Sequence, residues 1–144
     1  MKHYTHYLAL LLLILAGLYK NANAQQNLVP NGNFEEYNSC PTGVGQIISL
    51  ANWYTLTPSP DFFNACASIS SLVNVPYANF GFQIPASGNG FIGLPDYYTS
   101  NYREFIGNGI IPLQKGGRYS VSMSVSLSNS SNGGSNGLGV FFYQ

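Results

Sequence analysis

Residues Tyr119–Ser128 read YSVSMSVSLS, and no other stretch of the chain indicates the fold class as directly. Serine occupies every second position, and the residues between the serines are Tyr119, Val121, Met123, Val125 and Leu127. Because successive side chains of a β-strand point to opposite faces, this period of two predicts a strand with one apolar face and one serine face. The apolar face needs a cover, which favours a second sheet packed against the first, as in a β-sandwich. The serine face either meets solvent or lets another layer approach closely.

Turn-forming residues interrupt the rest of the chain at short intervals, and no segment shows a sustained helical period. Gly116 and Gly117 predict a turn before the strand, and residues 128–137 (SNSSNGGSNG) predict a loop after it. A return strand is expected at Leu138–Tyr143. The weaker strand predictions are Asn27–Val29, Phe34–Tyr37, Gln46–Leu50, Trp53–Leu56, Asn79–Ile84, Gly90–Leu94 and Tyr102–Ile106. Many short strands separated by turns are typical of an all-β chain, and we expect a β-sandwich or jelly roll.

The first 24 residues have the composition of an export signal. Lys2 supplies a positive charge, Leu8–Leu18 is an apolar run, and Ala22–Ala24 has the small-x-small pattern of a cleavage site. A membrane-spanning helix needs about 20 apolar residues, so a cleaved signal peptide is favoured over a membrane anchor. The first cysteine is Cys40, too far along the chain to take a lipid at the cleavage point.

The sequence therefore predicts a signal peptide at residues 1–24 and one β-sandwich module at residues 25–144. We expect the module in the periplasm, on the outer-membrane surface or outside the cell, without a transmembrane span. The chain ends within or just after the expected return strand. This position favours a fragment whose sandwich is incomplete at its C-terminus over a chain that stops there with an open sheet edge.

Removal of the signal peptide changes the chemistry that remains. The full chain has a formal net charge of zero, but both histidines, His3 and His6, and two of the five basic residues precede residue 25. The expected module at residues 25–144 has five acidic and three basic residues and no histidine. Ser-His-Asp and Cys-His catalysis and imidazole metal ligands are thereby excluded. The basic surface of a nucleic-acid binder is missing as well.

Carboxylates are the remaining means of catalysis, and a small glycosidase would need two of them at a defined separation. The plausible sources are Glu35, Glu36, Asp61, Asp96 and Glu104. Their spacing in the sequence selects no pair. We therefore expect a binding module and not an enzyme.

Cys40 and Cys66 are the only cysteines of the chain. An even pair in an exported chain usually forms a disulfide, and the alternative of two buried thiols requires a reducing compartment. The bridge would close a loop of 26 residues and stabilise the fold by about 3 to 4 kcal/mol in the loop-entropy description.

Trp53 and Tyr54 are adjacent, so on a strand their rings point to opposite faces. The Trp53 ring either fills the core of the sandwich or stacks on a sugar as a ligand platform. Residues 95–104 (PDYYTSNYRE) form a second candidate site, because tyrosine, asparagine and arginine offer the donors that sugar hydroxyls or carboxylates need. Its candidate ligand-binding residues are Tyr97, Tyr98, Asn101, Tyr102 and Arg103. The alternative is a solvated loop with tyrosine rings folded onto the sheet.

Arg103 and Glu104 are neighbours on an expected strand, so one of them must bury part of a charge. A buried charge needs a partner, and we expect one of these two residues to pair across strands.

Residues 27–37 (NLVPNGNFEEY), with Trp53 following and PLQKGGRYSVS at 112–122, resemble galactose-binding-like jelly rolls and carbohydrate-binding modules. Together with PDFFNAC at 60–66, GFQ at 81–83 and YREFI at 102–106, the chain is similar to a module of exported bacterial envelope proteins. In those proteins the module often precedes an OmpA-like domain or a type IX secretion sorting domain, neither of which is found in this sequence.

The resemblance implies a jelly roll that attaches a larger surface protein to glycan. It also implies a possible structural calcium at Glu35, bound with backbone carbonyls. No other cofactor is expected. The alternative function is a structural or adhesive module that contacts envelope proteins and has no sugar site.

Overall fold

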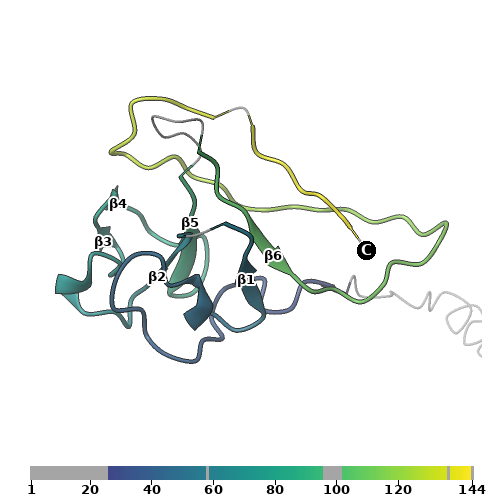
Figure 1. Ribbon diagram of the computed structural model, residues 1–144, viewed down its shortest axis with the longest axis horizontal. Helices are drawn as coiled ribbons and strands as arrows, with labels where there is room; N and C mark the ends of the chain where they lie inside the picture. Colours follow the sequence, from purple (N-terminus) through teal and green to yellow (C-terminus); the bar gives the residue numbers. More distant parts are fainter. Residues whose placement is uncertain (1–25, 58, 96–101, 136, 144) are drawn as a thin grey trace, which may run out of the picture.

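The structure is a computed structural model that describes residues 26–57, 59–95, 102–135 and 137–143 (Figure 1). The predicted signal peptide at residues 1–24 lies outside this range. The described part contains short strands, two single 3-10 turns and no α-helix, so the all-β class is confirmed. The elements are η1 (Ile47–Ser49), β1 (Trp53–Thr55), β2 (Asp61–Asn64), η2 (Ile69–Ser71), β3 (Tyr77–Ala78), β4 (Gly81–Phe82), β5 (Gly90–Gly93) and β6 (Ile106–Asn108).

The strands pair as three antiparallel sheets of two strands each: β1 with β6, β2 with β5, and β3 with β4. Trp53 lies opposite Asn108 in the first sheet, and Phe63 lies opposite Phe91 in the second. Only β3 and β4 form a local hairpin. The other two sheets join parts of the chain that are far apart in sequence, which brings the N-terminal loops onto the later strands.

Strand β2 is buried along its whole length and separates two hydrophobic clusters. Phe62, which is fully buried, points into a cluster with Ile47 and Leu50. Phe63 points to the other side, where it packs on Val73 and stacks on Phe91 with ring centroids 4.9 Å apart. The alternation of a strand thus places two neighbouring phenylalanines in two separate cores.

The turn at residues 30–33, near the start of the described chain, is organised by the buried side chain of Asn31. Its Nδ2 donates to the carbonyl oxygens of Glu36 and Ala51 at 2.8 Å each, and its Oδ1 accepts from the Glu36 amide at 3.0 Å. Asn31 has φ of 50°, a left-handed conformation that asparagine tolerates better than most residues. The loop that opens the described chain is therefore fixed against β1 by one amide side chain.

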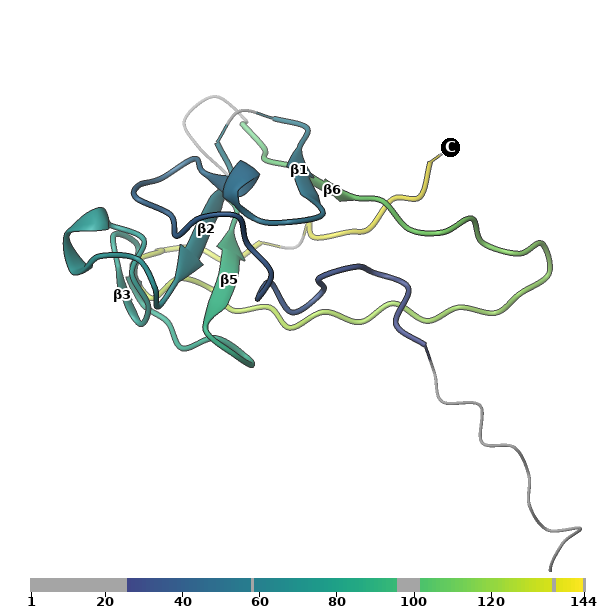
Figure 2. The ribbon, with the colours of Figure 1, turned by 90° about the horizontal axis from the view of Figure 1, so that it is seen from below.

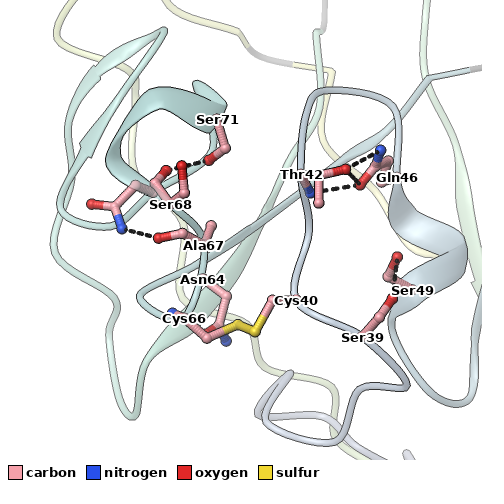
Figure 3. Close-up of a disulfide and its surroundings, with 11 residues drawn as sticks. Ser39, Cys40, Thr42, Gln46, Ser49, Asn64, Cys66, Ala67, Ser68 and Ser71 are labelled. Atoms are coloured by element: carbon pink, nitrogen blue, oxygen red, sulfur yellow. Dashed lines mark hydrogen bonds between the residues drawn. A yellow bond between two sulfur atoms is a disulfide. The ribbon is translucent and has the colours of Figure 1, made fainter.

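The Cys40–Cys66 disulfide is confirmed, with Cα atoms 5.7 Å apart (Figure 3). It ties the loop before η1 to the end of β2. Both partners lie in irregular segments, as the sequence predicts, and side-chain hydrogen bonds hold these segments. The Cys66 amide donates to Asn64 Oδ1 at 2.9 Å, and the Thr42 amide donates to Gln46 Oε1 at 2.8 Å.

The predicted strands are confirmed at β1 and β5, and in part at β4, which occupies two residues of the expected Asn79–Ile84. Three of the predicted strands are absent. Residues Asn27–Val29 and Phe34–Tyr37 form no strand, and Gln46–Leu50 contains the 3-10 turn η1 instead. Tyr37 and Leu50 share only an isolated bridge. Strand β6 starts at Ile106, the last residue of the strand predicted at Tyr102–Ile106.

The strands predicted at Tyr119–Ser128 and Leu138–Tyr143 are also wrong: neither segment has a ladder partner among the described residues. From Gly109 onwards the chain leaves the sheets, turns and comes back without joining them (Figure 2). The predicted turn is present, since the Gly117 amide donates to the Gln114 carbonyl at 3.0 Å. The apolar row of the first segment stays exposed, from 46% at Tyr119 to 62% at Val125.

The serine face of the same segment contacts another element, the β3–β4 hairpin. Ser126 Oγ donates to Gln83 Oε1 at 2.7 Å, Ser128 Oγ donates to the Phe80 carbonyl oxygen, and the Phe82 amide donates to Asn129 Oδ1 at 3.1 Å. Small hydroxyl side chains let the two segments approach closely here. At its C-terminal end the serine row therefore faces another layer that approaches closely, and not solvent alone.

Within the described residues, no helix is long and apolar enough to cross a membrane.

Candidate functional site

Exposed aromatic rings and polar groups meet in a groove between the β1–β6 sheet and the last described residues. Its volume is about 350 Å³. The lining is mostly apolar and consists of Val29, Tyr54, Asn108, Gly109, Ile110, Val121, Val140, Phe141, Phe142 and Tyr143. None of these side chains carries a charge. The groove therefore suits a ligand that is itself uncharged.

Tyr54 is one of the aromatic residues that line this groove. It alternates with Trp53 on β1 and points outward, with 40% of its surface exposed. Its strand partner is Gly107, and a Cβ atom at that position would overlap the tyrosine ring. The ring can therefore lie down across β6 only because residue 107 is glycine.

Two tyrosine hydroxyls of the groove lining form a hydrogen bond with each other. The oxygens of Tyr54 and Tyr143 are 2.6 Å apart, and this hydrogen bond raises the pKa of Tyr54 above its ordinary value, with smaller contributions from burial and the charge of Tyr143. Tyr54 thus stays neutral at physiological pH. Asn108 is another lining residue, and its Nδ2 donates to the Pro30 carbonyl at 2.9 Å, which fixes the orientation of the amide.

The sequence predicts that Trp53 is either a ligand platform or a core residue. In the structure its ring packs against a hydrophobic cluster, as expected of a core residue. The side chain is half-buried, its ring lies 5.2 Å from the Phe34 ring, and its indole N–H donates to the Asn31 carbonyl at 2.9 Å. The indole packs against the cluster around Phe62. Tyr54, its neighbour, is the ring that reaches the surface.

Of the second candidate site, Tyr97, Tyr98 and Asn101 lie outside the described residues. Tyr102 and Arg103 are both half-buried. The Tyr102 hydroxyl lies 3.4 Å from Glu104 Oε1 and 3.4 Å from Ser59 Oγ, and Arg103 Nη1 donates to the Tyr102 carbonyl at 3.0 Å. The Tyr102 hydroxyl thus faces a carboxyl group, and the structure does not bring it to the Tyr54 groove.

Glu104 is the member of the Arg103–Glu104 pair that is buried, with 7% of its surface exposed. Its partner is a hydroxyl and not a residue paired across strands: Ser59 Oγ donates to Glu104 Oε1 at 2.6 Å, and neither residue lies in a strand. Oε2 of the same carboxyl group is buried and has no hydrogen-bond partner among the described residues.

Asp61 is a second buried carboxyl group in the same region, 4% exposed, and accepts a hydrogen bond from the Gly45 amide at 2.5 Å. Burial raises the pKa of both carboxyl groups, and the charge of Asp61 raises the pKa of Glu104 further. The hydrogen bonds from Gly45 to Asp61 and from Ser59 to Glu104 act in the opposite direction. Among the acidic residues that the structure describes, Asp61 and Glu104 are the two that are buried.

These raised pKa values predict a pH dependence of stability in metal-free buffer. Folded Asp61 and Glu104 keep their protons at pH values where the unfolded chain has released them, so the unfolding free energy falls as the pH rises from the ordinary carboxyl pKa through the raised values. Urea unfolding measured between about pH 4 and 8 is expected to show this decline. The double variant Asp61→Asn, Glu104→Gln should show a flatter curve. An equal decline in the variant would refute the assignment.

Glu35, the predicted calcium ligand, holds the start of β5. Its carboxylate accepts hydrogen bonds from the Asn89 amide at 2.7 Å, the Gly90 amide at 2.9 Å and Asn89 Nδ2 at 3.1 Å. Gly88 fits this arrangement because a Cβ there would collide with the carboxylate. These contacts give Glu35 a structural role, and calcium binding at this residue stays a prediction.

No group of three or more His, Cys, Asp or Glu side chains that could hold a metal ion occurs in the described part of the chain. Comparisons with protein-family models, curated proteins and solved structures found no match.

The sequence predicts aromatic binding residues, but none of those that the structure describes lines the groove. It singles out Tyr54 only as the neighbour of Trp53, and it does not single out Asn108 or Tyr143. One signal is available: a glycine in a strand often marks a close approach, and Gly107 follows the predicted strand at Tyr102–Ile106. The register that places Gly107 opposite Tyr54 comes only from the structure.

Proposed function

We propose that this chain is a non-catalytic glycan-binding module, within an exported protein of the bacterial envelope, that binds uncharged sugar in the Tyr54 groove. The observation that carries the proposal is the exposed Tyr54 ring, laid flat across Gly107 beside the Tyr143 hydroxyl. A pyranose presents an apolar face of C–H groups surrounded by hydroxyls, so a flat ring with hydroxyl groups at its edge complements it. Binding sites of this kind combine apolar surface with a few placed polar groups.

Export is supported by two independent features. The signal-peptide pattern of residues 1–24 precedes the module, and the Cys40–Cys66 disulfide is typical of an oxidising compartment. The finer fold in the proposal, a galactose-binding-like jelly roll, would be reached if the segments 119–128 and 138–143 formed strands of a further sheet beside the groove. Val121 and Val140, one from each segment, already line it.

A glycan array followed by calorimetry of the best ligand tests the proposal. Tyr54→Ala should weaken binding of a neutral glycan about tenfold, a change of about 1.4 kcal/mol, because the stacking surface is lost. Tyr54→Phe keeps the ring and should retain most of the affinity. Tyr77→Ala is the matched control, since Tyr77 is 71% exposed but lies on β3, away from the groove. Equal losses for Tyr54→Ala and Tyr77→Ala would contradict a site at Tyr54.

The second candidate function, attachment through protein contacts, is favoured by the exposed apolar row Val121, Met123, Val125 and Leu127. A monomeric surface rarely carries so regular an apolar row without a partner. An array without any glycan ligand, together with retention on isolated envelopes that is lost after protease treatment, would favour this alternative.

A further inference from the structure

Oxygen atoms from three side chains converge beside the start of β2, outside the Tyr54 groove. Ser59 Oγ lies 2.6 Å from Glu104 Oε1, and the Tyr102 hydroxyl lies 3.4 Å from each of these two atoms. Asp61 lies two residues after Ser59, and Gly45, whose amide donates to Asp61 Oδ1 at 2.5 Å, also lies next to Ser59. The cluster contains neither nitrogen nor sulfur ligands.

The cluster combines burial with a missing partner. Glu104 is more than nine-tenths buried, and its Oε2 has no hydrogen-bond donor among the described residues, although a buried carboxylate oxygen is costly to leave unpaired. Asp61 is buried to the same degree. In the described part of the chain neither carboxyl group forms an ion pair. A positive charge at this point would satisfy both carboxylates and the orphaned oxygen.

We propose that Asp61 and Glu104 bind a calcium ion, with Ser59 and Tyr102 contributing neutral oxygens at its edge. Calcium takes six to eight oxygen ligands and accepts carboxylates, hydroxyls, carbonyls and water in irregular geometry. Two carboxylates therefore suffice when neutral oxygens and water complete the shell. Zinc and copper favour nitrogen and sulfur ligands, which this site lacks, and magnesium demands a more regular octahedron. The site is distinct from Glu35, whose carboxylate is used by the amides of residues 89 and 90.

Thermal unfolding of the purified chain with and without calcium chloride is the first test. At a calcium concentration about ten times the dissociation constant, the melting temperature should rise by about 5 °C. The expected dissociation constant is of the order of 10⁻⁴ to 10⁻³ M, as in extracellular modules. Glu104→Gln should abolish the response. The glutamine can still accept the hydrogen bond from Ser59 and removes a buried charge, so this variant is expected to fold.

Terbium luminescence gives a second readout that does not depend on stability. Terbium replaces calcium at oxygen sites, and excitation of Tyr102 should sensitise its emission, which calcium then displaces. Glu104→Gln and Asp61→Asn should each lower the emission at least tenfold. Glu36→Gln, at an exposed acidic residue, is the matched control and should leave it unchanged.

Two outcomes would overturn the proposal. One is a melting temperature that does not change with calcium. The other is a calcium response that survives both Glu104→Gln and Asp61→Asn, which would place the ion elsewhere.

Discussion

Phe62→Ala is expected to lower the free energy of unfolding by about 3–5 kcal/mol, the range for a phenylalanine truncated in a core. Phe62 is fully buried, and its cluster includes Ile47 and Leu50 together with the half-buried rings of Phe34 and Trp53. Truncation would leave a cavity that touches η1, β1 and the N-terminal loop at once. Urea unfolding followed by tyrosine and tryptophan fluorescence measures the change, since Trp53 borders the cavity.

Phe141→Ala is the matched control for this prediction. The same substitution is made at a side chain that is 84% exposed, so it should change stability by no more than about 0.5 kcal/mol. Phe63→Ala, in the other cluster, should destabilise the chain as strongly as Phe62→Ala, because its stacking on Phe91 is lost too. Similar losses of unfolding free energy for Phe62→Ala and Phe141→Ala would contradict the placement of β2 at the centre of the core.

Strand β2 also shows why this part of the fold could not be predicted from the sequence. A strand buried on both faces has no alternation of apolar and polar residues, and the short run Phe62–Phe63 lies between Pro60 and Asn64, which look like loop residues. The correctly predicted strands, β1 and β5, have enough local pattern to be recognised. The disulfide is predictable because cysteine pairing depends on compartment and number, and not on the local conformation.

The stretch Tyr119–Ser128 shows the opposite error. Its alternation is the most regular of the chain, yet a strand exists only where a neighbouring strand supplies hydrogen bonds, and no described segment pairs with it in a ladder. Sequence pattern indicates which face would be apolar but not whether a partner is present. For the same reason the groove residue Tyr54 could be placed on a strand face from sequence, whereas its proximity to Tyr143 could not.

The Asp61–Glu104 pair needs the fold for another reason. The two residues lie far apart in the chain, and the sequence offers several acidic residues of equal merit. Ser59 precedes β2, and its hydroxyl donates to the carboxylate of Glu104, which precedes β6. Asp61 follows Ser59 by two residues and so starts β2 beside this contact. Both of these carboxyl groups are buried, whereas that of Glu36 is exposed to solvent.

Removal of the disulfide, by the double substitution Cys40→Ala, Cys66→Ala, is expected to lower the unfolding free energy by about 3 to 4 kcal/mol. The bridge closes a segment with a sequence separation of 26, and the loss of conformational freedom in the unfolded chain scales with the logarithm of that length. This segment contains η1, β1 and β2, and therefore the buried side chains Ile47 and Phe62. The constraint thus acts on the part of the chain that builds the core.

The dependence on denaturant separates this effect from a change in native packing. Without the bridge the unfolded chain expands, so the slope of the unfolding free energy against urea should rise as the midpoint falls. Both sulfur-bearing residues lie at exposed positions, so alanine at each site should create little cavity. Reduction of the unsubstituted protein should reproduce the double variant. If the midpoint fell with an unchanged slope, the stabilisation would come from contacts in the folded loops between residues 38 and 50, and not from the restricted unfolded chain.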